Sequence, residues 1–158
     1  MKIVPYSEKY KQDFVELNTS WITEMFVLED EDVRLLNNVD CEISKGAQIF
    51  FAIDEETDVV ASCCMVAPCD ESTWEIEKFA TRKEFAGRGA GTACFQACVN
   101  FARAHNAKRL VIVSNTKCEQ ALRIYRRHGF VEIPINKEIF PFDRGNISFE
   151  LKFEEASS

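Results

Sequence analysis

The amino-acid sequence predicts an α/β (α+β) fold: a mixed, mostly antiparallel sheet of six or seven strands flanked by about four helices. Two observations lead to this fold class. Three β-rich segments, 48–53, 59–66 and 74–81, follow one another with short polar connections, an order typical of an antiparallel meander. The last segment is followed by an amphipathic stretch over 90–105 and an apolar strand over 109–113, which together predict a central β-α-β crossover.

The length of the chain limits the number of domains. At 158 residues it can bury one sizeable core but is too short for two ordinary domains. We therefore expect a single domain over residues 1–153, followed by a frayed tail over residues 154–158.

The composition narrows the class of protein. A net charge of −7 argues against general nucleic-acid binding, because neutralising phosphates requires a basic surface. No apolar stretch reaches about 18 residues, and the start lacks the apolar core of a secretory signal, so we expect a cytoplasmic protein with no membrane partner. The seven cysteines are irregularly spaced, which predicts small buried side chains in a reducing compartment and no metal site.

The other elements of the first half follow from capping residues and apolar spacing. Residues 2–5 predict an edge strand, and Ser7 is a candidate N-cap for a helix with one apolar face. That face carries Phe14, Leu17, Trp21, Ile22, Met25 and Phe26. The acidic run that begins the segment 29–47 predicts a second helix, opened by Asp30 or Asp32. We interpret this run as a solvated helix start; attraction of a cationic ligand is the alternative.

The second half closes with a helix and two strands. Residues 118–128 form a helical pattern that Gly129 ends, because glycine is favoured just past a helix terminus. Residues 130–135 and 146–153 then predict two closing strands. Arg144 and the glycine after it indicate a hairpin turn in preference to a substrate clamp.

Three glycines, at positions 87, 89 and 91, lie between the strand 74–81 and the following helix. Without a Cβ they leave several amide N–H groups exposed at the positive end of the helix dipole, an arrangement that binds phosphate. Thr92 adds a hydroxyl, and three cations are near in sequence: Arg82, Lys83 and Arg88. The alternative is a tight strand-to-helix turn that uses glycine for its geometry alone.

Neither familiar phosphate motif fits this loop. A P-loop ends in Gly-Lys-Ser/Thr, whereas this chain has Gly91-Thr92-Ala93. A dinucleotide fingerprint places its third glycine one position later and requires an acidic residue at the tip of the next strand, where this chain has Val113-Ser114-Asn115. Nucleoside triphosphate hydrolysis and dinucleotide binding are therefore disfavoured.

A second block of sequence follows the strand 109–113. The stretch SNTKCEQALRIYRRHGF contains Ala121, Tyr125 and Gly129-Phe130 in the spacing Ala-x-x-x-Tyr-x-x-x-Gly-Phe. With this block and the glycine loop, residues 74–132 resemble the GNAT superfamily of acetyl-CoA-dependent N-acetyltransferases. The loop is similar to that family's Arg/Gln-x-x-Gly-x-Gly/Ala signature, with Ala86 standing where Arg or Gln is usual.

The resemblance implies a GNAT-like domain with a site for acetyl-CoA. It places pantetheine between the strands 75–81 and 110–115, bonded through main-chain groups. The residues that it assigns to cofactor binding are Phe79, Ala80, Thr81, Ala86, Gly87, Arg88, Gly89, Ala90, Gly91, Thr92, Asn115 and Tyr125. It assigns no metal.

The resemblance also implies the reaction: an acetyl group passes from acetyl-CoA to a primary amine of a small molecule or peptide, by direct attack in a ternary complex. Tyr125 is expected to protonate the departing thiolate, and Glu75 to accept the amine proton, with Glu77 or water as other candidates for the base. Structural alternatives stay open. Tyr125 fits a core aromatic, and both glutamates fit solvated side chains or partners of Lys78.

Two other functions are left open by the sequence. A non-catalytic acyl-CoA-binding or sensing module would keep the glycine loop without turnover, and a different phosphate-ligand enzyme would prefer a nucleoside triphosphate. No motif specifies the acceptor amine. Relatives often dimerise, so a homodimer is left open as well.

Overall fold

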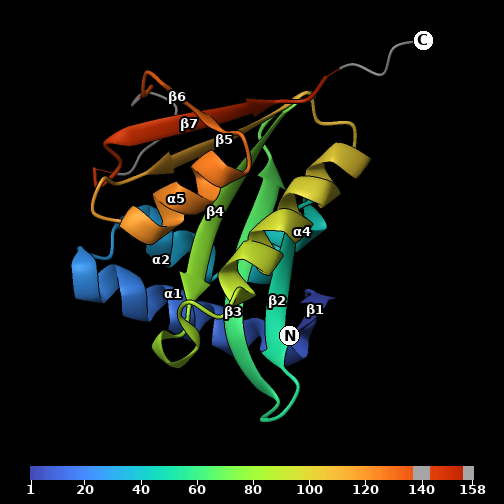
Figure 1. Ribbon diagram of the computed structural model, residues 1–158, viewed down its shortest axis with the longest axis vertical. Coiled ribbons are helices and arrows are strands. Elements are labelled where there is room, and N and C mark those ends of the chain that lie inside the picture. The colour runs from blue at the N-terminus through green and yellow to red at the C-terminus, as the bar shows by residue number, and fades with distance from the viewer. Residues whose placement is uncertain (137–142, 155–158) are drawn as a thin grey trace.

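A computed structural model of the chain describes residues 1–136 and 143–154 and has a mixed sheet at its centre (Figure 1). In the described residues the sheet has seven strands in the order β1-β2-β3-β4-β5-β7-β6. The strands are β1 Lys2–Pro5, β2 Gln48–Asp54, β3 Val59–Pro68, β4 Thr73–Thr81, β5 Arg109–Ser114, β6 Val131–Ile133 and β7 Ile147–Lys152. Neighbouring strands are antiparallel except β4 and β5, which are parallel and joined by a helix. The predicted fold class, with its meander and crossover, is confirmed.

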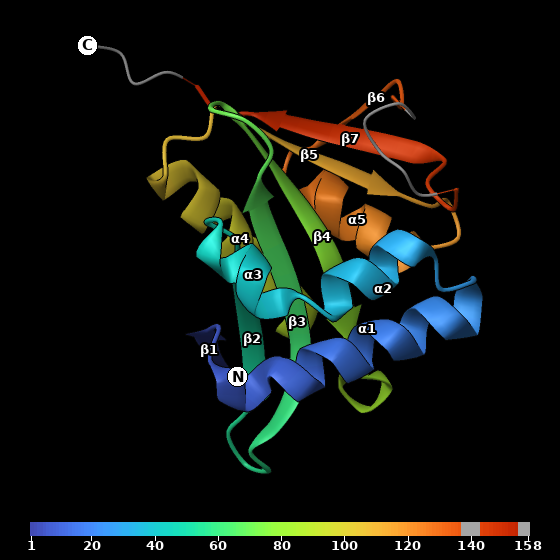
Figure 2. The same cartoon turned by 180° about the vertical axis from the view of Figure 1, so that it is seen from behind.

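Helices cover both faces of the sheet. One face carries α4 Ala90–Ala104 and α5 Glu119–Arg127 (Figure 1). The other carries α1 Lys11–Met25, α2 Asp30–Leu36 and α3 Val39–Ser44 (Figure 2). The two helical layers therefore approach the sheet, and any opening in it, from opposite sides. No helix of the described segments is long and apolar enough to cross a membrane.

Several predicted boundaries were wrong in detail. Ser7 precedes a short 3₁₀ turn, Glu8–Tyr10, and makes no side-chain cap; α1 begins after that turn. The segment 29–47 forms two helices, not one, and the first is capped by Glu29, whose carboxylate and that of Asp32 form a reciprocal capping box. The first closing strand is also shorter than predicted. Of the expected tail, residues 155–158 lie outside the described residues.

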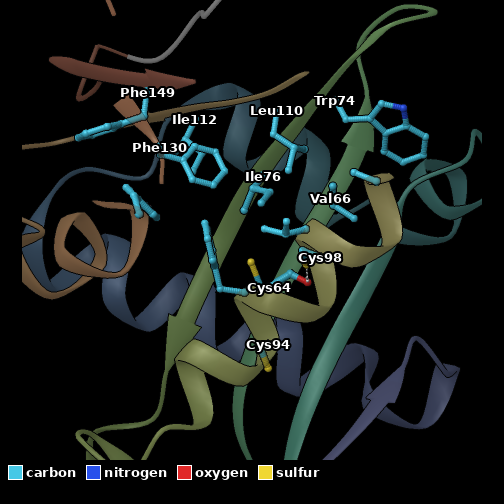
Figure 3. Packing of buried hydrophobic residues seen from close by; sticks show 14 of the residues in the cluster. Cys64, Val66, Trp74, Ile76, Cys94, Cys98, Leu110, Ile112, Phe130 and Phe149 are labelled. Atoms are coloured by element: carbon cyan, nitrogen blue, oxygen red, sulfur yellow. Dashed lines mark hydrogen bonds between the residues drawn. The ribbon is translucent and has the colours of Figure 1, made fainter. Parts of the chain in front are cut away.

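The side chains that hold the layers together form two apolar clusters, one on each face of the sheet. Under α4 and α5, Cys64, Cys94 and Cys98 pack with branched and aromatic residues such as Ile76 (Figure 3). The thiol of Cys98 donates a hydrogen bond of 3.3 Å to the carbonyl oxygen of Cys64. The prediction of buried cysteines holds for Cys63, Cys64, Cys94 and Cys98, whereas Cys41 and Cys69 are exposed and Cys118 is partly buried.

An irregularity in β4 opens the middle of the sheet. Cys63 pairs with Ala80 and Met65 with Glu77, so that β4 has one residue more than β3 across this interval. Lys78 lies in this bulge with a positive φ of 53°. On β4, the parallel pairing with β5 covers only Thr73–Glu75. Beyond this point β5 continues alongside β7, and β4 diverges from β5 (Figure 1). The main chain of β4 beyond residue 75 therefore has no ladder partner on its β5 side.

Candidate active site

A cavity of about 460 Å³ lies where β4 and β5 separate. Its walls come from both faces of the sheet. The α1 side contributes Trp21, Met25 and Phe26; β4 contributes residues 75–81; β5 and the turn after it contribute residues 112–115; and the α5 side contributes residues 117–121, Ile124 and Tyr125, with Arg144 and Gly145 completing the lining. This volume is typical of a pocket for a small molecule or cofactor.

Tyr125 reaches the cavity from α5 and is buried. Its ring packs against Phe95 and Phe149, with centroid distances of 5.4 and 5.5 Å. Burial raises the pKa of the Tyr125 phenol well above its usual range, and a hydrogen bond with Ser114 opposes this shift in part. The residue is thus both a core aromatic and a neutral proton donor beside the cavity.

Glu75 and Glu77 line the same cavity from β4, and both are partly buried. Burial, followed by the neighbouring charge of Glu77 and a hydrogen bond between the two carboxyl groups, raises the pKa of Glu75 well above its ordinary value of 4.5. Lys78 does pair with Glu77, as one structural alternative held, with its Nζ 3.7 Å from Oε1. A carboxyl group whose pKa is raised in this way is a stronger base than an ordinary carboxylate and can accept a proton from a bound cation.

The residues after the bulge connect the cavity to the glycine loop. Phe79, Ala80 and Thr81 all line the cavity, and the hydroxyl of Ser62 fixes the end of β4 by bonding the carbonyl oxygen of Ala80 at 2.8 Å. A Cβ placed on Gly91 would lie 2.9 Å from Oγ1 of Thr81 and 3.3 Å from the ring of Phe79. Gly91 is therefore needed for the close packing of α4 on β4.

The other two glycines of the loop, Gly87 and Gly89, are required by their backbone conformation and not by close packing. Gly87 and Gly89 have φ angles of +77° and +83°, which side chains rarely adopt, and an added Cβ on either would meet no atom within 4 Å. Gly89 directly precedes α4, whose first amides, those of residues 90–92, have no acceptor within the helix. Ala86, Gly87, Arg88 and Gly89 are exposed, Ala90 is buried and Thr92 is partly buried. The loop thus presents unobstructed amide donors at a helix N-terminus, as an anion site requires.

The cations expected around this loop are largely engaged elsewhere. Arg82 donates to the carbonyl oxygen of Val60 at 3.0 Å and pairs with Asp13 of α1 at 3.7 Å. The ammonium of Lys83 pairs with Glu24, also of α1, at 2.6 Å. The guanidinium of Arg88 lies over the ring of Phe85, 5.0 Å from its centroid. The anion-binding capacity of the loop therefore comes from its main chain.

Asn115 bridges two loops at the cavity wall. Its Nδ2 donates a hydrogen bond of 2.6 Å to the carbonyl oxygen of Arg144, and its Oδ1 accepts one of 2.9 Å from the amide of Lys117. Both ends of the Asn115 amide are thus used within the protein. Its observed contacts fix the segment before β7 against the start of α5, while the cofactor contact implied by the resemblance stays a prediction.

A buried ionic cluster that the sequence analysis missed lies on the other side of the cavity. The carboxylate of Asp32, fully buried, accepts from Lys78 Nζ at 3.0 Å and from both terminal nitrogens of Arg144 at 2.5 and 2.6 Å. Glu29 binds the same guanidinium at 3.3 Å. The expected solvated helix start is therefore wrong at Asp32, and Arg144 is a structural partner of α2 as well as part of a turn. The sequence did contain a signal for the bulge in β4. Apolar and polar residues stop alternating between Ile76 and Phe79, where Glu77 and Lys78 are both polar.

Two parallel central strands that separate around a cavity, beside a glycine-rich loop, are the features of the GNAT fold. The chain belongs to the Acetyltransferase (GNAT) family, whose family model matches residues 10–130. No sequence among the curated proteins matches the chain. Among the residues described by the structure, no group of three or more His, Cys, Asp or Glu side chains is arranged to hold a metal ion.

Solved structures show the same fold at low sequence identity. An acetyltransferase of the GNAT family from Staphylococcus aureus has a TM-score of 0.86 at 18% identity, covering 97% of this chain and 99% of that one. The yncA protein of Salmonella typhimurium, solved with its cofactor acetyl-CoA, has a TM-score of 0.75 at 15% identity and covers 100% and 96%. Rv2747 of Mycobacterium tuberculosis, in complex with CoA and NLQ, has a TM-score of 0.74 at 16% identity and covers 98% and 100%.

The buried cluster leads to a stability prediction. Burial alone would raise the pKa of Asp32, but the hydrogen bonds from Arg144, the charge of Lys78 and the amide of Glu29 hold it below its ordinary value of 3.8. Replacing Asp32 by Asn removes the carboxylate shared by the buried Lys78 and the partly buried Arg144, so we expect the free energy of unfolding in urea at pH 7 to fall by about 3 kcal/mol or more.

The pH dependence of this loss is also set by the sign of the shift. The ionised Asp32 stabilises the folded state above its ordinary pKa, and this contribution disappears as the pH falls through the lowered pKa. The difference between wild type and Asp32→Asn should therefore be full at neutral pH and shrink below pH 3.8. Asp40→Asn is the control, because that carboxylate pairs with Lys11 at the surface and is 60% exposed. A loss as large in the control as in Asp32→Asn would contradict the prediction.

Proposed function

We propose that the protein is an N-acetyltransferase that transfers the acetyl group of acetyl-CoA to a primary amine of a small molecule or peptide, by direct attack in a ternary complex. The observation that carries the proposal is the cavity at the β4–β5 opening, which has Glu75 and Tyr125 in its walls. The carboxyl pair offers an acceptor for the amine proton, and the phenol offers a donor for the leaving group.

The residues present fit a CoA donor. The amides at the start of α4, with open space before Gly87 and Gly89, suit a pyrophosphate, and the main chain of β4 beyond residue 75 can bond an extended pantetheine arm. When bound, acetyl-CoA supplies an activated acetyl thioester. Phe79, Ala80 and Thr81 are the residues proposed to line the arm, and Asn115 to hold the adjoining loop in place.

The proton transfers follow from the two pKa shifts. Glu75, with its raised pKa, takes a proton from the ammonium form of the acceptor, which leaves a neutral nitrogen with a free electron pair. The nitrogen forms a bond to the acetyl carbon as the carbon–sulfur bond breaks. Tyr125, kept neutral by burial, gives its proton to the departing sulfur. The second proton, which the nitrogen loses on forming the amide, returns to Tyr125, and the first leaves Glu75 for solvent. The products are an acetamide, the free CoA thiol and one proton.

The test of the function is release of the CoA thiol. Acetyl-CoA and the purified protein are mixed with a panel of amines that includes amino acids, polyamines, aminoglycosides, arylalkylamines and peptide N-termini, while binding of CoA is measured by calorimetry. We expect CoA binding, and thiol release that depends on an amine.

The small side chain of Ala86, at the position where the family has Arg or Gln, favours one second candidate, a non-catalytic acyl-CoA-binding module. Binding without release for every amine would select that module, and preferential binding of a nucleoside triphosphate would exclude both.

Tyr125→Phe removes the proposed acid and keeps the ring that packs on Phe95. We expect kcat to fall by roughly 100-fold or more, because general acid catalysis contributes about 10²–10⁴ in rate. The Kd for acetyl-CoA, measured by calorimetry, should change little. Tyr10→Phe is the matched control, since Tyr10 packs on Phe51 and does not line the cavity. Unchanged turnover in Tyr125→Phe would remove the residue from its proposed role.

Glu75→Gln tests the proposed base through a pH profile. Because the base form of Glu75 exists above its raised pKa, kcat/KM of the wild type should decline on acidification through a pH above 4.5. The Gln variant should have a lower kcat/KM and lack this limb. Glu77→Gln removes a negative charge that contributes to the raised pKa of Glu75. In that variant the decline of kcat/KM on acidification should therefore move to lower pH. An unaltered limb in both variants would assign the proton acceptor to water or to another group.

A further inference from the structure

The part of the cavity that faces α1 has an apolar wall. Trp21 and Phe26 meet edge to face with their ring centroids 6.3 Å apart, and Met25 beside them is 42% exposed. All three come from the last turn of α1 and the residue after it, on the face of the sheet opposite to α5 (Figure 2). An acceptor that approaches from this side, away from Tyr125, therefore meets aromatic and thioether surface.

The polar groups on this side favour a cation. Glu75 and Glu77 project into the cavity from β4, and their carboxyl groups are close enough to hydrogen-bond each other. Even with one proton shared between them, the pair retains a negative charge. The amino group of an acceptor is placed well beside this pair, because Glu75 is the group proposed to receive its proton.

Two cations of the wall, the buried Lys78 and the partly buried Arg144, do not offer a matching site for an anion. The charge of Lys78 is compensated by Asp32 at 3.0 Å, and that of Arg144 by Asp32 at 2.5 Å and Glu29 at 3.3 Å. Arg144 also lies over the ring of Trp21, 5.8 Å from its centroid. Lys117 lies at the exposed rim, over the ring of Phe26, and the exposed Glu119 lines the same rim with the opposite charge. Neither Lys78 nor Arg144 therefore offers a carboxylate beside the acceptor amine an uncompensated charge in return for its lost hydration, and Lys117 lies out at the exposed rim.

We propose that the acceptor is an arylalkylamine-type substrate: a primary amine on an apolar, ring-sized stem, with no anionic group next to the amine. This inference rests on the proposed function and narrows it. The apolar wall at the end of α1 holds the ring, the glutamate pair holds the ammonium group, and the compensated cluster around Asp32 excludes amino acids that carry a free carboxylate.

A matched series of four amines tests the inference. Phenylethylamine has the ring and the amine; phenylalaninamide adds a neutral amide; phenylalanine replaces that amide by a carboxylate; and ethylamine lacks the ring. The readouts are kcat/KM for thiol release and Kd for the CoA-saturated protein by calorimetry. We expect phenylethylamine and phenylalaninamide to exceed both phenylalanine and ethylamine by roughly tenfold or more in both readouts.

Two variants connect the result to the residues named. Trp21→Leu should raise KM for phenylethylamine several-fold and leave the Kd for acetyl-CoA unchanged, whereas Val27→Ala, at a 78% exposed neighbour of Phe26 that does not line the cavity, should change neither. Glu29→Gln removes one of the carboxylates that compensate the positive charge of Arg144. A substrate carboxylate should then be tolerated better, so the preference for phenylethylamine over phenylalanine should become smaller in that variant.

The outcomes separate this inference from the function on which it rests. Phenylalanine equal to or better than phenylalaninamide would overturn the inference, as would efficient turnover of ethylamine or polyamines without turnover of the aryl amines, and in both cases the acetyltransferase function would stand. If CoA binds but no amine releases thiol, the proposed function fails. In that case the Kd values of the four amines for the CoA-saturated protein still test whether the site prefers an aryl amine without a carboxylate.

Discussion

Lys78 combines a left-handed backbone conformation in the middle of a strand with a buried ammonium group bonded to Asp32. A non-glycine residue in this conformation costs about 1–3 kcal/mol and persists only where its surroundings fix it. Here the fixed partner is a carboxylate on α2, which Arg144 binds as well. The bulge that results shifts the end of β4 out of register with β3, and β4 leaves β5 after only three paired residues. The opening in the sheet, and with it the cavity, depends on this arrangement.

The opening gives the two ends of the cavity different physical characters. On the α4 and α5 side lie the main-chain edge of β4, the phenol of Tyr125 and, beyond the cavity itself, the amides of the glycine loop. On the α1 and α2 side the groups available to a ligand are side chains: an aromatic wall, a carboxyl pair and a charge-compensated cluster. Recognition by main chain tolerates changes in sequence, so the donor end can be common to distant relatives. Recognition by side chains is particular to one chain, so differences in substrate would be encoded at the end that is proposed to receive the acceptor.

The sequence predicted the meander, the crossover, the glycine loop and the buried strand β5, because these depend on local periodicity and on single residues such as Gly89. It also assigned Glu75 and Tyr125 to one site, through the resemblance and not through periodicity, and both line the cavity. It missed the ionic cluster, since Asp32 and Lys78 are 46 residues apart and each is ordinary for its local segment. Burial of a charged residue is a property of the tertiary structure. The helix start at Glu29 looked solvated because the partner that buries it, Arg144, comes from the other end of the chain.

The cluster around Asp32 also limits how the specificity of this fold can change during evolution. Asp32 compensates the charges of both Lys78 and Arg144, so a single substitution of Asp32 in favour of a new acceptor would cost stability. Trp21, Met25 and Phe26 are under no such restriction, because they are partly exposed and make no ion pairs of their own. Under the proposed function, divergence among close homologues in the amines that they use should therefore accumulate at the C-terminal end of α1, while the charged positions change only in compensated groups.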